Sequence, residues 1–285
     1  MLNFLKSSIG TLYSMGAFVI LILMMIVGIR SGFGFPIITT IFSALVVMLF
    51  FTVMMKRPKL VTNRHLPTYA IPILLSFVLS LINSAPEFGE HWLPISLNAS
   101  LVVGWFLYNY AYSLYPVRSQ LLKVGDHIPL MTFENTHGNV VHSEMFLGSP
   151  SVFLFYRGNW CPLCMLQIEE IAAKYKDIES LGAKVILISP QPHHYSKELA
   201  EKFNLGFHFL VDVENKVAKQ LGIFHHNGLP LGLQTQGYKN DTVMPTLLIT
   251  DETGRILFAD LTDNYRIRPE PSTILQVLKG NEVVA

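Results

Sequence analysis

The two cysteines of this 285-residue chain, Cys161 and Cys164, are separated by two residues. An apolar, β-prone run, residues 151–155, precedes them, and a helical pattern follows them. Pro162 suits the first position of that helix, where a backbone N–H would have no partner. Two cysteines at a strand-to-helix turn can do thiol chemistry, because their sulfur atoms lie one helical turn apart and can reach each other.

Two local features favour ionisation of a thiol at this turn. The helix N-terminus offers unpaired N–H groups and a partial positive charge, and Arg157 lies on the incoming chain. Both should lower the pKa of a nearby thiol, and the thiolate is the reactive form. We expect one exposed attacking thiol and one more protected partner. Cys161 lies at the mouth of the turn, and Cys164 begins an apolar helical stripe.

Other interpretations of these residues stay open from the sequence alone. The cysteines could be inert and buried, Arg157 could be a surface cation, and Pro245 could be an ordinary proline at the start of a strand. The histidine pairs at 193–194 and 225–226 could supply zinc ligands. A four-ligand zinc site needs ligands that converge, which the sequence does not show. We therefore predict no metal.

The elements that would position the cysteine pair form an α/β pattern after residue 125. Strands that alternate with helices imply a sheet covered on both faces. The predicted strands span residues 128–133, 140–142, 151–156, 184–189, 208–211, 246–250 and 256–259. The predicted helices span residues 161–182, 195–203, 215–221 and 271–278, and a glycine-rich loop spans 223–242.

The composition of the chain changes sharply before this pattern begins. Residues 1–120 contain seven basic and two acidic residues, whereas the remainder contains 14 basic and 18 acidic residues. Few charges and four successive apolar runs predict transmembrane helices rather than the core of a soluble protein. A cleavable signal peptide would explain only the first run. The predicted spans are residues 11–29, 36–55, 66–83 and 93–114.

The sequence thus predicts an α-helical membrane domain, residues 1–120, followed by a thiol-bearing α/β domain, residues 121–285. The loop after the second span contains four basic residues, whereas the loop after the third contains only acidic ones. Because basic loops stay on the cytoplasmic side, this places the C-terminal domain in the cytoplasm.

Apart from Asn98 and Asn109, no polar residue recurs inside the spans at helical spacing, and no proton relay or ion path is evident. We predict that the spans anchor the protein in a lipid bilayer, as in an integral protein of a bacterial inner membrane. The net charge of +1 gives no indication of nucleic-acid binding. No cofactor site is predicted.

Several segments resemble one known family. They are Val124-Gly125-Asp126 with Pro129, Phe153-Leu154-Phe155-Tyr156-Arg157-Gly158-Asn159-Trp160-Cys161-Pro162-Leu163-Cys164, Met244-Pro245-Thr246 and Asn264-Tyr265-Arg266-Ile267-Arg268-Pro269-Glu270. Together they make residues 121–280 similar to the thioredoxin-fold proteins. Within these they resemble the alkyl hydroperoxide reductase and thiol-specific antioxidant branch, the peroxiredoxin-like proteins. The resemblance implies a thioredoxin fold for the α/β domain.

The resemblance implies two different assignments of the cysteines. In thioredoxin-like oxidoreductases the first cysteine attacks and the second resolves, so Cys161 would attack, with Pro245 as the facing cis-proline. In the peroxiredoxin pattern the peroxidatic cysteine would be Cys164. Cys161 then stands where that pattern has threonine, and Arg157 where it has proline. The second arginine of a peroxiredoxin site would fall near Pro245, where this chain has none.

Three functions follow from these patterns. The first is a membrane-anchored, peroxiredoxin-like thiol peroxidase that cycles through a Cys161–Cys164 disulfide and is reduced by a thioredoxin-like protein or a small thiol. The second is a thiol–disulfide oxidoreductase that acts on protein disulfides. The third is a membrane protein that senses redox state without catalysis. We predict the first, with Cys161, Cys164, Arg157 and Pro245 as catalytic residues.

Overall fold

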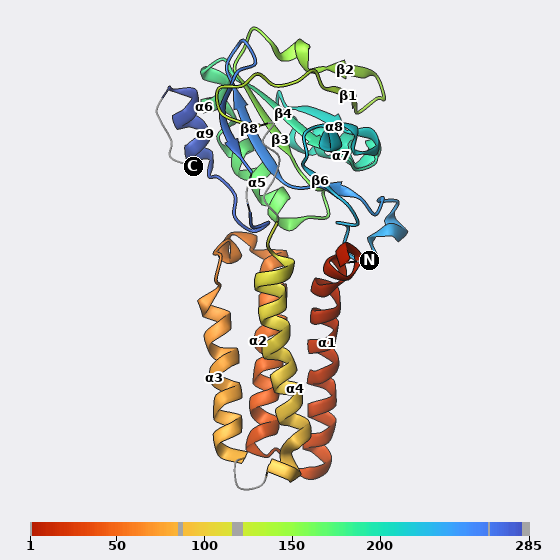
Figure 1. Ribbon diagram of the computed structural model, residues 1–285, viewed down its shortest axis with the longest axis vertical. Coiled ribbons are helices and arrows are strands. Elements are labelled where there is room, and N and C mark those ends of the chain that lie inside the picture. The colour runs from red at the N-terminus through yellow and green to blue at the C-terminus, as the bar shows by residue number, and fades with distance from the viewer. Residues whose placement is uncertain (1, 85–87, 116–121, 262, 281–285) are drawn as a thin grey trace. The chain divides into compact units, whose positions relative to one another are not determined.

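The computed structural model describes residues 2–84, 88–115, 122–261 and 263–280 (Figure 1). The chain divides into two compact units, Met1–Leu114 and Tyr115–Ala285. The predicted domain boundary, after residue 120, lies outside the described residues.

The N-terminal unit is helical. Its long helices are α1 (Leu2–Ser31), α2 (Phe35–Lys56), α3 (Pro67–Ser84) and α4 (Phe88–Phe106), and they run alongside one another (Figure 1). A short helix, η1 (Pro58–Val61), follows α2, and a π-helical segment, η3 (Leu107–Tyr112), follows α4. The first three predicted spans fall on α1 to α3, and the fourth falls on α4 and η3.

Three of these helices have the length and composition needed to cross a membrane. They are α1 from Ser8 onward, α2 and α3, and no further helix qualifies among the residues that the structure describes. Their large apolar side chains are exposed in many places, for example Phe18, Phe42 and Leu75. The unit is therefore compatible with membrane association, and a topology of four spans stays a prediction.

Uncharged polar side chains join the helices inside this unit. Ser43 Oγ lies 3.0 Å from Ser76 Oγ and 2.8 Å from Asn98 Oδ1, so α2 is linked to both α3 and α4. Thr40 Oγ1 also donates to the carbonyl of Pro94, at 2.9 Å. Hydrogen bonds between apolar helices fix how the helices pack. Asn98, noted in the sequence, is thus a packing residue.

The C-terminal unit contains a seven-stranded mixed sheet. In spatial order its strands are β2 (Val140–His142), β1 (Thr132–Asn135), β5 (His208–Val211), β4 (Lys184–Ser189), β3 (Ser151–Phe155), β8 (Thr246–Thr250) and β9 (Ile256–Asp260). Strands β3, β4 and β5 are parallel, whereas β8 runs antiparallel to β3 and β9 antiparallel to β8. The central strands are buried on both faces, as their continuous apolar runs require.

Helices cover both faces of this sheet. Helix α7 (His193–Phe203) lies beside α5 (Pro162–Ala173), since Lys202 Nζ lies 3.2 Å from Glu169 Oε1. The same face is covered by α6 (Tyr175–Ser180) and α9 (Pro271–Leu278), which contact each other. Helix α8 (Lys216–Gln220) covers the other face, where Val217 and Ala218 pack in one core with Phe153 and Ile186. A parallel βαβ unit followed by an antiparallel strand pair and a closing helix is the thioredoxin-like arrangement. The predicted α/β class is therefore confirmed for this unit.

Most predicted elements of this unit are present, and three differ. The helix predicted for residues 161–182 is interrupted at Lys174, whose φ of −109° and ψ of 11° are not helical. The first strand begins at Thr132 rather than at residue 128. The loop predicted for residues 223–242 contains β6 (Phe224–His225), which pairs with β7 (Thr242–Val243), and the short helix η6 (Leu233–Gln236). Two-residue strands are too short to show a periodic pattern, so the sequence did not reveal them.

Candidate active site

The sheet brings three distant chain segments together at one end of its strands. Strand β3 ends at Phe155, which pairs with Thr246, the first residue of β8. Strand β9 ends at Asp260, which lies opposite Leu247. The turn after β3, the residues before β8 and the segment after β9 therefore emerge together, at the carboxyl end of the parallel strands. Open α/β sheets bind their ligands at this end.

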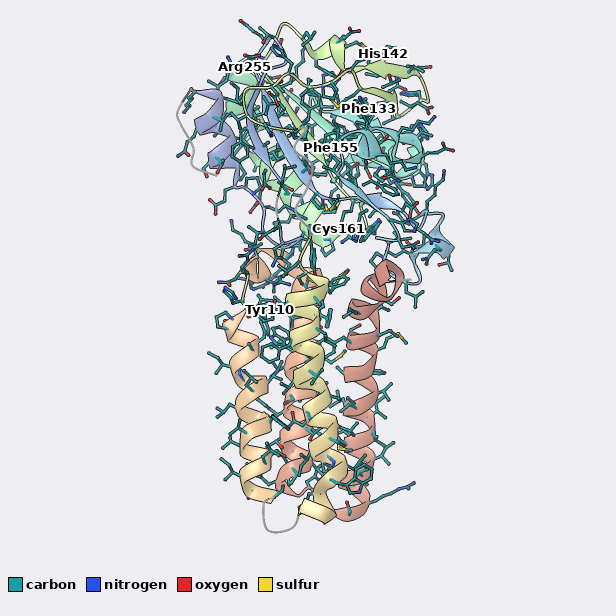
Figure 2. All side chains as sticks on the ribbon, in the orientation of Figure 1. Tyr110, Phe133, His142, Phe155, Cys161 and Arg255 are labelled. Atoms are coloured by element: carbon teal, nitrogen blue, oxygen red, sulfur yellow. The ribbon has the colours of Figure 1, made fainter. Side chains whose placement is uncertain are left out.

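The cysteine pair lies just beyond that end of the sheet, at the start of α5. Figure 2 labels Phe155 in the sheet and Cys161 past its end. Cys161 is the N-cap residue, Pro162 occupies the first helical turn, and the Cys164 N–H donates to the Cys161 carbonyl at 3.0 Å. The helix starts where the sequence predicts because Pro162 has no N–H to satisfy there.

Both thiols are free and both are buried. The exposed fraction is 2% for Cys161 and 1% for Cys164, and their Sγ atoms lie 2.8 Å apart. The prediction of one exposed thiol is therefore wrong. The turn directs the Cys161 side chain towards Cys164 rather than towards solvent, so the two sulfur atoms share one enclosed position.

The two thiols differ in acidity. Burial raises the pKa of Cys164, but the hydrogen bond from Cys161, the charge of Arg268, a backbone hydrogen bond from Arg157 and the charge of Arg157 together lower it to about 6. Burial also raises the pKa of Cys161, and the hydrogen bond to Cys164 and the Cys164 charge raise it further. These opposite shifts favour ionisation of Cys164 over ionisation of Cys161.

Arg157 is an interior residue rather than a surface cation. Only 5% of it is exposed, and its Nη2 donates to the carbonyl of Gly228. Its guanidinium lies 4.7 Å from the centre of the Trp160 ring, a favourable cation–π position. Thr242 Oγ1 donates to the Arg157 carbonyl at 3.1 Å. The loop of residues 224–243 thus holds Arg157 from two sides.

Polar contacts also fix the rest of the turn before the cysteines. The Asn159 N–H donates to Gln191 Oε1 at 2.8 Å, and Gln191 Nε2 donates to the Tyr156 hydroxyl at 3.1 Å. The Tyr238 hydroxyl donates to Asn159 Oδ1. Gly158 has a φ of +149°, and a Cβ there would lie 2.6 Å from Trp160 Nε1, so only glycine fits.

Arg268 is the residue of this site that the sequence analysis did not assign. It lies on the segment between β9 and α9, and its charge lowers the pKa of both thiols, although burial outweighs this effect at Cys161. Residues 264–270 entered the resemblance only as a matching motif, with no role assigned to Arg268. The signal that could have identified Arg268 is the strand order, because β9 ends at the same end of the sheet as β3.

The remaining predicted residues have simpler positions. Pro245 is buried directly before β8, beside the end of β3 in the sheet register. The cis peptide expected there is absent, since no described residue forms one. Within the described ranges, no group of three potential metal ligands converges. His193 Nε2 instead lies 2.8 Å from Glu134 Oε2, and His226 Nδ1 lies 2.9 Å from Asp241 Oδ1.

Comparisons with known proteins indicate the family of the C-terminal unit. A profile of the AhpC/TSA family matches residues 124–259. A chloroplastic peroxiredoxin Q from Suaeda salsa is 28% identical over 164 residues, which are 56% of this chain and 75% of that protein. A putative peroxiredoxin bcp from Haemophilus influenzae is 25% identical over 159 residues, which are 56% of this chain and 97% of that protein.

This chain is a thioredoxin-fold, peroxiredoxin-like protein. A solved structure with a similar fold, the peroxidoxin BcpB of Mycobacterium tuberculosis, is 18% identical, has a TM-score of 0.46 and covers 57% of this chain and 99% of its own. The AhpC/TSA match and the peroxiredoxin relatives, by contrast, indicate a thiol-dependent peroxidase oxidoreductase. Both cysteines, Arg157 and Pro245 lie inside the range matched by the family profile, whereas Arg268 lies beyond it.

Proposed function

We propose that this peroxiredoxin-like protein reduces hydroperoxides through its Cys-Pro-Leu-Cys turn, with Cys164 as the attacking thiolate and Cys161 as the resolving thiol. The observation that carries the proposal is the pair of sulfur atoms 2.8 Å apart, of which Cys164 has the lowered pKa. An enclosed thiolate next to two arginines has the charge and the surroundings that a peroxidatic sulfur needs.

The first chemical step oxidises Cys164. Its thiolate attacks one oxygen of the hydroperoxide, an S–O bond forms and the O–O bond breaks. The departing alkoxide or hydroxide takes a proton from water, so that Cys164 ends as a sulfenic acid and the product is an alcohol or water. The sulfur loses two electrons and the peroxide gains them. Arg157 stabilises the thiolate before the attack.

The second step uses Cys161. Once Cys164 has become an uncharged sulfenic acid, the negative charge that raised the Cys161 pKa is gone. Cys161 then loses its proton more easily, attacks the Cys164 sulfur and releases water as the S–S bond forms. The proximity of the two sulfur atoms makes this step almost free of chain movement. An external thiol reductant, either a thioredoxin-like protein or a small thiol, then reduces the disulfide.

The second predicted function, exchange with protein disulfides, needs Cys161 to attack first. Two observations weigh against it as the main activity. Cys161 is 2% exposed, so a folded protein substrate does not reach it, and its raised pKa keeps it protonated at neutral pH.

Peroxide consumption in single-cysteine variants tests these roles. In stopped-flow mixing with hydrogen peroxide, Cys161→Ser should still form a sulfenic acid on Cys164 that a dimedone probe traps, whereas Cys164→Ser should form none. The wild-type protein should give an intramolecular disulfide instead. Rapid peroxide reduction by Cys164→Ser would reverse the assignment, and failure of the wild-type protein to consume peroxide would reject the function.

We further propose that the N-terminal unit anchors the enzyme in a lipid bilayer with the redox domain on the cytoplasmic side. The three long apolar helices and the basic loop after α2 support this arrangement. In membranes from an expressing bacterium, the protein should resist extraction by alkaline carbonate. A C-terminal tag should be cleaved by protease in inverted vesicles but not in spheroplasts. Cleavage in spheroplasts alone would reverse the orientation.

A further inference from the structure

The segment between β9 and α9 is built to hold one side chain in place. The Arg266 N–H donates to Asn264 Oδ1 at 3.0 Å, and the Ile267 N–H donates to the Asn264 carbonyl at 3.0 Å. Asn264 and Arg266 are both fully buried. This turn fixes the backbone immediately before Arg268, at the end of the sheet where β3 delivers the cysteine pair.

Arg268 carries hydrogen-bond donors that no described protein group uses. Its Nη1 donates to the neighbouring Ile267 carbonyl at 3.0 Å, whereas Nε and Nη2 are buried without a partner in the described part of the chain. Nε and Nη2 form the side of a guanidinium that binds two acceptor atoms at once. Leaving buried donors unpaired is costly, so native proteins rarely do it without a reason.

The charge of Arg268 acts on the thiol that we propose to attack the peroxide. Arg268 and Arg157 both act electrostatically on Cys164, but Arg157 already donates to Gly228 and stacks on Trp160. Arg268 therefore combines an electrostatic effect on Cys164 with buried donors that have no acceptor in the described part of the chain. The position near Pro245, where the resemblance would put a second arginine, holds none.

We propose that Arg268 is a catalytic residue for peroxide reduction, whose Nε and Nη2 donate to the oxygen atoms of the hydroperoxide as Cys164 attacks it. This inference rests on the proposed function and adds a residue outside the range that the family profile matches. The two donors hold the O–O bond in line with the sulfur and stabilise the negative charge that develops on the departing oxygen. Arg268 gives up no proton, and the departing oxygen takes its proton from water.

The test separates contact with the substrate from a general effect of charge. If Arg268 only lowered the pKa of Cys164, Arg268→Gln would recover the full rate once the pH is high enough to ionise the thiol. If Arg268 binds the peroxide, the rate stays low at that plateau. The full-length protein in detergent micelles is mixed with hydrogen peroxide from pH 5 to pH 9, and Trp160, next to Cys161, serves as the fluorescence reporter.

A second reagent reports on the thiolate itself. Iodoacetamide alkylates Cys164 without using a hydroperoxide, so its plateau rate measures access and ionisation alone. For Arg268→Gln we expect the plateau rate with hydrogen peroxide to fall about 100-fold, while the plateau rate with iodoacetamide changes little. Arg268→Lys, which keeps the charge but not the two-donor geometry, should recover only part of the rate.

The matched control is Arg255→Gln, which removes an exposed arginine of the same domain. It should match the wild-type protein with both reagents. Equal hydrogen peroxide plateaus in Arg268→Gln and wild type would overturn the role of Arg268 and leave the proposed function intact, and so would an equal loss with both reagents. A wild-type protein that reacts with iodoacetamide but not with peroxide would instead overturn the proposed function, and this inference with it.

Discussion

The two units of the chain bury polar side chains of different kinds. In the N-terminal unit, the buried polar side chains that the structure describes are uncharged serines, threonines and asparagines, while large apolar side chains lie on the outside. The C-terminal unit buries its apolar side chains and encloses Arg157 and Arg266 with the two thiols. Charge is costly to bury unless something uses it. The comparison indicates that packing governs the first unit and that reactivity is confined to the second.

The largest loss of reactivity is expected from a change at Arg157, in the C-terminal unit. Replacement by methionine removes a buried charge that lowers the Cys164 pKa, so the pKa should rise and the rate with hydrogen peroxide at pH 7 should fall about 100-fold. Stopped-flow kinetics measure the rate, and alkylation against pH measures the pKa. Lys216→Met, which removes an exposed charge, serves as the control. An unchanged rate in Arg157→Met would contradict the electrostatic role.

The pH dependence of the peroxide rate tests the reactivity of the C-terminal unit without a mutation. Cys164 has a pKa of about 6, lower than its ordinary value, so its thiolate is nearly complete at pH 7 and is lost as the pH falls through 6. The rate with hydrogen peroxide should therefore drop about tenfold between pH 7 and pH 5, since the thiolate fraction drops by that factor. A midpoint near pH 9 would mean that the arginines and Cys161 do not act on this thiol.

In the helical unit, a mutation should affect stability without affecting chemistry. Asn98→Leu removes the partner of Ser43 between α2 and α4 and should destabilise the unit by about 1 kcal/mol. Thermal unfolding in detergent should show the change, while the peroxide rate stays at the wild-type value. Ser96→Ala, on an exposed position of the same helix, is the matched control. A lower peroxide rate in Asn98→Leu would show that the two units are functionally coupled.

The smallest expected effect concerns Tyr238. Tyr238→Phe keeps the ring stacked on Tyr195 at 4.8 Å but removes the hydroxyl that donates to Asn159. Loss of one such hydrogen bond costs about 1 kcal/mol and should slow peroxide reduction only a few-fold. Tyr195→Phe, whose hydroxyl donates to the Gln236 carbonyl away from the redox turn, should leave the rate unchanged. Equal rates in all three proteins would show that the Asn159 contact does not position the turn.

The sequence was most informative where local rules decide the structure. The apolar runs at 184–189 and 246–250 occur as strands with those bounds, and Pro162 marks the start of α5 because its missing N–H suits only that position. The burial of Cys161 could not be predicted, because the direction of an N-cap side chain depends on what packs against the turn. The role of Arg268 was equally hidden, since only the pairing of β8 with both β3 and β9 brings that segment to the cysteines.

The enclosure of both sulfur atoms has a consequence for turnover. We expect hydrogen peroxide, which is small, to reach Cys164 while both sulfur atoms are buried. A thiol reductant, however, must align one of its own sulfur atoms with the Cys161–Cys164 bond. We expect the reductant to gain that access only when the loop of residues 224–243 releases Arg157 and Asn159. Oxidation would then be fast and recovery slow, so the oxidised form would accumulate and outlast a brief pulse of peroxide.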